Sequence, residues 1–252
     1  RSRLSVLIGP AGTGKTTLLK ALADLPDVAN KGVLLLAPTG KASVQLRTKV
    51  GRDARTLASF LVKKRGYDPD RDVYRPVDAS QADDFGLVVI DEASMLNVRL
   101  FYSLMSAIPR EAHVIIVGDV DQLPPIGAGF VLKDLLDSDM VPYTRLQHIY
   151  RQSSGNSIVD SAYAINRGEM PNLDTTSDEF TFISVNSLGD MMKAIVDVYK
   201  REKEFVDDEL DIQIISPMRR GKAGSTSISQ YVQQSVNPPD SYKGEARVNG
   251  MT

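Results

Sequence analysis

The sequence contains no cysteine, only two histidines and no long apolar run. The lack of cysteine excludes disulfide bonds and thiolate metal sites, and it fits a cytoplasmic protein. Because His113 and His148 are the only histidines, we expect no metal site built from several histidines. No stretch approaches the roughly 20 apolar residues of a membrane helix, so no membrane partner is expected. Residues Arg1–Leu7 lead directly into an apolar run, so we expect no signal peptide.

Neither sign of charge dominates the chain. Its 30 lysines and arginines face 32 acidic residues, which gives a net charge of −2. This balance argues against a strongly basic coat for nucleic acid, although a local basic stripe would be enough to contact phosphates. With 42% apolar and 25% charged residues, the 252 residues have the composition of a soluble globular protein with one large domain or two small ones.

The first half of the chain alternates between two kinds of segment. The apolar, strand-like runs are Leu4–Ile8, Val33–Ala37, Leu87–Ile90 and Val114–Val117. The helix-like segments between them are Lys15–Leu25, Lys41–Val50 and Val98–Ile108. Strands that are apolar along their whole length are typical of a parallel sheet covered on both faces. We therefore predict an α/β fold with a parallel sheet.

A similar alternation resumes after Pro142. We predict helices at Ile158–Asn166, Leu188–Lys200 and Ser225–Val236, and strands at Phe180–Val185 and Ile212–Ser216. This pattern indicates a second α/β unit.

The segment Gly9-Pro10-Ala11-Gly12-Thr13-Gly14-Lys15-Thr16 matches the Walker A pattern, and Thr17 follows it. It comes after a strand-like run and opens a helix, which is the context that this motif requires. Its glycines let backbone N–H groups surround phosphates, Lys15 can reach the β- and γ-phosphates, and Thr16 can bind Mg²⁺. We predict a site for ATP and Mg²⁺; the alternative is a chance match in a glycine-rich turn.

Two carboxylates, Asp91 and Glu92, follow the apolar run Leu87–Ile90. At the carboxyl end of a parallel strand they would lie beside the ligand. Asp91 could hold Mg²⁺, and Glu92 could orient and deprotonate the attacking water. The alternative is a helix cap formed by Asp91 or Ser94. Gln122 follows another apolar run and could sense whether a γ-phosphate is bound. The alternative is a turn stiffened by proline, because the neighbouring Asp, Gly and Pro residues are ordinary turn residues.

Six segments together resemble the superfamily 1 helicases, and the RecD-like branch in particular. They are GPAGTGKTT, APTGKA from Ala37, VVIDEASML from Val88, VGDVDQLPPIGAG from Val117, IYRQ from Ile149 and SPMRRGKAG from Ser216. The resemblance implies two RecA-like domains. It also implies that Gln122 senses the γ-phosphate and that Arg151 reaches it from the second domain. For Arg151, the alternative is a surface salt bridge.

The resemblance also implies contacts with the phosphates of single-stranded DNA. The residues in the family's positions are Pro38, Thr39, Thr56, Arg219, Arg220 and Lys222. Thr39 could serve instead, or as well, as a helix cap, and the three basic residues could form a solvated turn. The family usually has a histidine where this chain has Ala58, so a DNA contact is not supported there.

We expect a first RecA-like domain at residues 1–145 and a partial second one at 146–252. Residues 62–85 interrupt the first, where the family carries a β-hairpin pin that meets DNA duplex junctions. Tyr67 and Tyr74 would pack within this insertion or face DNA, and packing is the favoured role.

The resemblance predicts an ATP-dependent DNA helicase motor that moves 5′ to 3′ along single-stranded DNA. We expect a monomer, or a member of a larger repair complex. The alternatives are a P-loop ATPase that acts on RNA and a non-catalytic scaffold. Because the sequence ends before the family's motifs V and VI, we expect a fragment that by itself unwinds DNA weakly or not at all.

Overall fold

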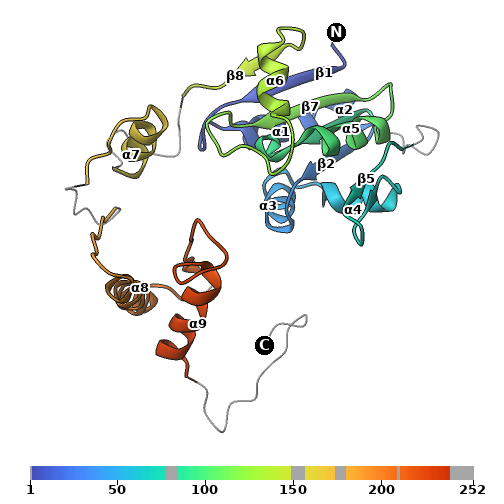
Figure 1. Cartoon of the computed structure of the whole chain (residues 1–252). Helices are drawn as coiled ribbons and strands as arrows, with labels where there is room; N and C mark the ends of the chain where they lie inside the picture. Colours follow the sequence, from blue (N-terminus) through green and yellow to red (C-terminus); the bar gives the residue numbers. More distant parts are fainter. Residues whose placement is uncertain (1, 78–84, 149–156, 174–179, 209–210, 239–252) are drawn as a thin grey trace. The chain divides into compact units, whose positions relative to one another are not determined.

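The computed structural model of the chain describes residues 2–77, 85–148, 157–173, 180–208 and 211–238 (Figure 1). The chain divides into two compact units, Arg1–Met170 and Pro171–Thr252. The predicted boundary at residues 145 and 146 precedes this division, and the assignment of two RecA-like domains stays a prediction. Among the described residues, every helix is too short or too polar to cross a membrane.

The first unit is built on a sheet of six parallel strands (Figure 1). They are β1 (Leu4–Ile8), β2 (Val33–Ala37), β3 (Ala54–Thr56), β6 (Leu87–Ile90), β7 (His113–Gly118) and β8 (Tyr143–Arg145). Across the sheet the order is β3-β2-β6-β7-β1-β8. The predicted α/β fold with a parallel sheet is confirmed.

Helices cover both faces of this sheet. They are α1 (Lys15–Ala23), α2 (Pro26–Ala29), α3 (Gly40–Val50), α4 (Leu57–Lys63), the 3₁₀ turn η2 (Ala93–Met95), α5 (Val98–Ala107) and α6 (Val131–Asp137). The helix α7 (Ser157–Asn166) follows β8 in the chain and contributes no residue to the two apolar clusters on the sheet. On one face, Val6, Val88 and Ile90 pack with residues of α4, α5 and α6. On the other face, Leu7 and Val89 pack with residues of α1 and α3. Because successive side chains of a strand point to opposite faces, these strands are apolar along their whole length.

A small hairpin forms within the insertion predicted at residues 62–85. Its antiparallel strands are β4 (Tyr67–Asp68) and β5 (Val73–Tyr74). The rings of Tyr67 and Tyr74 stack with centroids 4.5 Å apart, so the favoured packing role of these residues is confirmed. The Val77 N–H donates to Ser106 Oγ of α5 at 2.8 Å, which ties the end of the hairpin to the core of the first unit.

The second unit contains two long helices packed on each other. They are α8 (Leu188–Glu202), which continues into the 3₁₀ turn η3 (Lys203–Phe205), and α9 (Ser225–Val236). Met192 and Val196 of α8 pack against Ile228 and Val232 of α9. The helices predicted after Pro142 are therefore confirmed, with α7 and α8 slightly longer than expected.

The strands predicted at Phe180–Val185 and Ile212–Ser216 are wrong. In the described part of these segments only Phe180 forms an isolated bridge. Both segments instead line one hollow beside α8, to which Ile183 and Ile214 contribute apolar side chains. Most of their apolar side chains nevertheless stay exposed, Ile183 by 47% and Ile215 by 87%, and the described residues form no ladder there beyond the bridge at Phe180.

We predict that Phe60→Ala destabilises the first unit by about 3–5 kcal/mol, because it removes a large side chain and leaves a cavity. Phe60 lies on α4 and is only 2% exposed. Urea unfolding followed by circular dichroism would measure the change. Val62→Ala, on the same helix but at a side chain that is 44% exposed, is the control and should change stability by less than about 0.5 kcal/mol. Equal effects of the two substitutions would contradict the packing described.

Candidate nucleotide site

The loop between β1 and α1 contains residues Gly9 to Thr17 and depends on its glycines. Gly12 and Gly14 have φ angles of 82° and 86°, in the left-handed region that side chains with a Cβ rarely adopt. Gly14 is the N-cap of α1, and it has no side chain to occupy the first N–H groups of the helix. These groups, together with the positive end of the helix dipole, form a site suited to an anion.

Gly9 is needed for a second reason, which is close packing. A Cβ at this position would lie 2.7 Å from the carbonyl oxygen of Leu146 and 2.8 Å from Thr13 Oγ1. The Thr13 hydroxyl donates to the carbonyl of Pro10 at 2.9 Å, and Thr13 is buried. The loop is therefore fixed both from within and by the segment that follows β8.

The ammonium group of Lys15 lies within the curve of this loop. Its Nζ donates to the carbonyl oxygens of Gly9 at 2.6 Å and Pro10 at 2.9 Å. Lys15 thus carries a positive charge at the end of α1 where backbone N–H groups also point. Both features favour phosphate.

The acidic pair lies at the carboxyl end of β6. Asp91 Oδ1 accepts a hydrogen bond from the N–H of Glu92 at 2.9 Å. Burial raises the pKa of the Asp91 carboxyl above its ordinary value, while the Glu92 N–H and the charges of Lys15 and Lys49 oppose this shift. Glu92 itself has a left-handed backbone with φ 52°. For a residue with a long side chain this is strained, and such strain often accompanies a functional site.

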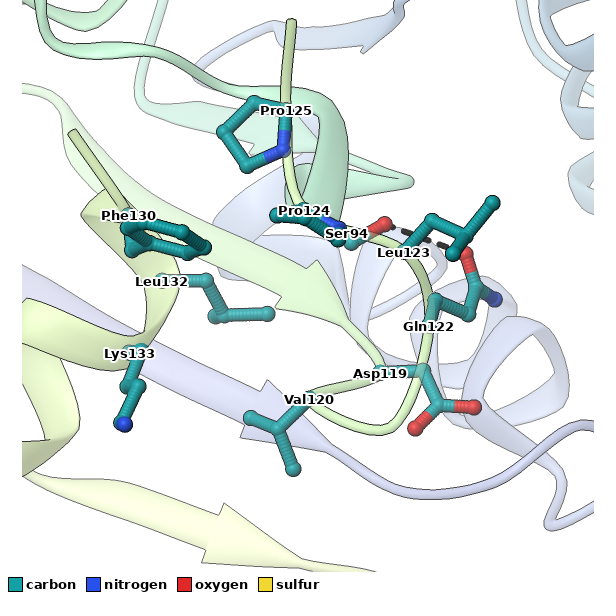
Figure 2. Close-up of a pocket in the computed structure, with 10 residues that line it drawn as sticks. All are labelled: Ser94, Asp119, Val120, Gln122, Leu123, Pro124, Pro125, Phe130, Leu132 and Lys133. Atoms are coloured by element: carbon teal, nitrogen blue, oxygen red, sulfur yellow. Dashed lines mark hydrogen bonds between the residues drawn. The ribbon is translucent and has the colours of Figure 1, made fainter. Parts of the chain in front are cut away.

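Gln122 lies in the loop that follows β7. Its amide oxygen accepts a hydrogen bond from the hydroxyl of Ser94 at 3.0 Å, as Figure 2 shows. The loop begins with a turn in which Asp119 Oδ1 accepts from the N–H of Asp121 at 3.1 Å. Asp119 is buried, and burial raises the pKa of its carboxyl. The alternative of a helix cap by Ser94 is wrong, since its side chain bonds to Gln122 and Asn97 caps α5.

One cavity of about 610 Å³ brings the predicted groups together. It is lined by six residues of the loop and its helix, namely Ala11, Gly12, Gly14, Lys15, Thr16 and Thr17, and by Asp91, Glu92 and Gln122. The loop of residues Gly9 to Thr17, which we call the phosphate cradle, therefore contributes to the same cavity as the acidic pair and Gln122. The role of each residue stays a prediction.

Three further residues line this cavity that the sequence analysis did not identify: Lys20 of α1 and Gln45 and Lys49 of α3. Gln45 and Lys49 are four residues apart and therefore lie on the same face of their helix. That spacing is visible in the sequence, but only the packing of α3 beside α1 reveals which way the face points.

Pro38, Thr39 and Thr56, predicted to contact DNA, lie together at the carboxyl edge of the sheet, since β2 and β3 are paired with Ala37 beside Thr56. Both threonines cap helices. Thr39 Oγ1 accepts from the N–H of Ala42 at 3.2 Å, and Thr56 Oγ1 accepts from the N–H of Ser59 at 3.0 Å. The capping alternative for Thr39 is confirmed, and DNA contacts by these residues stay predictions.

The predicted basic residues of the second unit, Arg219, Arg220 and Lys222, are exposed on a compact loop before α9. Among the described residues none of the three forms an ion pair. The loop is closed by the N–H of Ser225, which donates to the carbonyl of Met218 at 2.8 Å. Arg151 lies outside the described residues.

Comparisons with known proteins agree with these features. A family model described as AAA domain matches residues 1–186. The chain is 34% identical over 249 residues to the ATP-dependent RecD2 DNA helicase of Deinococcus radiodurans, covering 97% of this chain and 33% of that protein. It is 31% identical over 225 residues to the RecBCD enzyme subunit RecD of Mycobacterium tuberculosis, covering 82% of this chain and 36% of the subunit.

The chain spans about a third of the length of these two relatives. Among solved structures it resembles the crystal structure of Pif1 helicase from Candida albicans, with a TM-score of 0.50 and 21% identity over 81% of this chain and 52% of that one. At this level of identity the likeness supports the fold alone.

We predict that Lys15→Ala weakens binding of a nucleoside triphosphate by about tenfold or more, the scale of a lost hydrogen bond to a charged group. Titration with a fluorescent triphosphate analogue would measure the affinity. Lys133→Ala, at an exposed lysine of α6 outside this cavity, removes the same charge and should leave the affinity unchanged. Equal affinity of the Lys15 variant and the unchanged chain would contradict the assignment of the cradle.

Proposed function

Because this chain belongs to the AAA domain family, and its curated relatives include RecD-type helicases, we propose that it is the ATP-hydrolysing motor of a DNA helicase. Its substrates would be ATP and single-stranded DNA, along which ATP hydrolysis drives movement. The direction, 5′ to 3′, follows from the RecD-like resemblance.

The observation that carries this proposal is the shared cavity of about 610 Å³. A phosphate cradle alone would suit many nucleotide-binding proteins. Hydrolysis also needs a base for the attacking water and a group that responds to the γ-phosphate. Glu92 and Gln122 line the same cavity as Lys15, and they are the residue types that these two tasks require.

The oxygen donors in the cavity fit Mg²⁺. Thr16 offers a hydroxyl and Asp91 a carboxylate, both of them hard oxygen ligands. The described residues contain no cluster of three or more metal-binding side chains, and Mg²⁺ in nucleotide sites is usually held by one or two carboxylates together with the phosphates. When bound there, Mg²⁺ would neutralise charge on the β- and γ-phosphates.

The residues would then divide the reaction between them. Lys15 and the N–H groups of the loop hold the phosphates, which fixes the γ-phosphorus for in-line attack. Glu92 accepts a proton from the attacking water. Gln122 donates its amide N–H groups to the γ-phosphate and so distinguishes the triphosphate from the diphosphate product.

We assign a grip on DNA phosphates to the basic loop of the second unit, Arg219, Arg220 and Lys222. It precedes α9, whose N-terminus adds a positive dipole end. Contacts of this kind carry no sequence information, which suits a protein that moves along a strand. On the first unit, Pro38, Thr39 and Thr56 would contact the strand.

The hairpin of β4 and β5 is our candidate for the wedge that meets a duplex junction. Its stacked tyrosines and its bond to Ser106 make it a rigid element. Opening one base-pair step costs roughly 1.4 kcal/mol on average. An obstacle fixed to the motor domain would suffice, because hydrolysis of ATP drives the strand past it.

We predict that Glu92→Gln retains ATP binding but lowers hydrolysis by roughly 100-fold or more, because it removes the base and keeps the size of the side chain. Single-turnover hydrolysis, with the chain in excess over labelled ATP, would measure the rate. Glu111→Gln, at an exposed carboxylate before β7, is the matched control. The rate should rise with single-stranded DNA and not with RNA. A normal rate in the Glu92 variant would exclude its role as base.

We predict that the double substitution Arg219→Ala and Arg220→Ala weakens binding of single-stranded DNA and reduces its salt dependence. The slope of log affinity against log salt should fall by about 0.7 for each phosphate contact that is lost. Fluorescence anisotropy at several salt concentrations would measure both quantities. The control removes two charges elsewhere in the second unit, Lys200→Ala with Arg201→Ala on α8. If both pairs of substitutions have the same effect, the loop has no specific role.

A further inference from the structure

The short segment after the acidic pair is bonded to the loop that carries Gln122. Asn97 Nδ2 donates to the carbonyl of Ile126 at 3.0 Å, and the N–H of Val98 donates to the carbonyl of Ala128 at 3.0 Å. Asn97 is also the N-cap of α5. The far end of the loop is therefore fixed to the start of a helix, and its near end is fixed to β7 by the turn at Asp119.

Both ends of the loop are thus held, and the position of the Gln122 amide depends in addition on the torsions of its own side chain. This side chain is exposed, so water could satisfy its amide group. It bonds instead to the hydroxyl of Ser94, which is only 8% exposed and is fixed by the packing of its segment against the end of β7. A buried, well-placed hydroxyl thus holds a flexible amide (Figure 2).

The chemistry of the amide gives this bond a consequence. Its oxygen accepts from Ser94, so its NH₂ group remains available, and that group has two donors and no acceptor. A phosphate oxygen is an acceptor and requires such a donor. Because Gln122 also lines the nucleotide cavity, the bond to Ser94 leaves the NH₂ group of the amide available to donate to the nucleotide.

We propose that Ser94 is a positioning residue for Gln122, which fixes the amide so that its NH₂ group meets the γ-phosphate of ATP. This inference rests on the proposed function. Ser94 lies two residues after Glu92, which has a left-handed backbone conformation. The same short segment therefore contains the proposed base, Glu92, and the serine that positions Gln122.

The test compares binding of a triphosphate with binding of a diphosphate. Ser94→Ala should weaken binding of a fluorescent non-hydrolysable ATP analogue by about three- to tenfold, the scale of one neutral hydrogen bond. Binding of the matching ADP analogue should not change, because it has no γ-phosphate. Single-turnover hydrolysis should fall by a similar factor. Ser94→Thr retains the hydroxyl and should restore most of both losses.

A double-mutant cycle identifies Gln122 as the partner. In the background of Gln122→Ala, the additional change Ser94→Ala should have no further effect on binding of the triphosphate, because the group that it positions is gone. Ser103→Ala is the matched control. Its hydroxyl is also buried, on α5, and has no hydrogen-bond partner among the described residues, so affinity should be unchanged.

Three results would overturn the proposal. These are unchanged triphosphate binding in Ser94→Ala, equal losses for triphosphate and diphosphate, or additive effects of the two substitutions in the cycle. Equal losses would mean that the serine only supports the fold of the site. Failure of the proposed function has a different signature, because the unchanged chain would then not bind or hydrolyse ATP and Lys15→Ala would have no effect.

Discussion

The nucleotide site depends on one constraint, which is the hydrogen bonding of β7 to both β1 and β6. The register pairs Ile8 with Gly118 and Ile90 with Ile116, so β1 and β6 end at the same edge of the sheet. Neighbouring strands lie about 4.8 Å apart, so the cradle after β1 and the carboxylates after β6 are separated by roughly 10 Å. That spacing leaves room for phosphates and a cation between them. If β7 did not lie between β1 and β6, the loop after β1 and the carboxylates after β6 would be too close together or misaligned, although both motifs would still be present in the sequence.

The same sheet offsets the unfavourable features of the site. A left-handed residue other than glycine costs on the order of 1–3 kcal/mol, and Glu92 is such a residue. Asp91 is also held in surroundings that disfavour its ionised form. Burying one large aliphatic side chain contributes about 1.5–3 kcal/mol, and Val88 and Ile90, in the strand that leads to the acidic pair, are both fully buried. The strain is therefore local, and the strand beneath it is sufficient to maintain it.

How well the sequence predicted each feature depends on how local that feature is. The cradle and the acidic pair were predictable because each is a contiguous segment whose own glycines or apolar run fix its geometry. The approach of Lys49 to the nucleotide cavity was not, since it depends on how α3 packs beside α1. The predicted strands Phe180–Val185 and Ile212–Ser216 failed because an apolar run alone does not specify a neighbouring strand with which to form a ladder. Their apolar side chains line a hollow beside α8 and remain largely exposed.

Charge is distributed unevenly over this chain, although its net charge is only −2. At physiological salt, exposed charges act over about 8 Å, so a phosphate responds to the nearest side chains and not to the total. Two carboxylates, Asp91 and Glu92, line the candidate nucleotide cavity. Exposed cations without ion-pair partners among the described residues gather on the loop of Arg219 and Arg220. A near-neutral total is therefore compatible with both the proposed cation site at the carboxylates and the proposed phosphate grip on the loop.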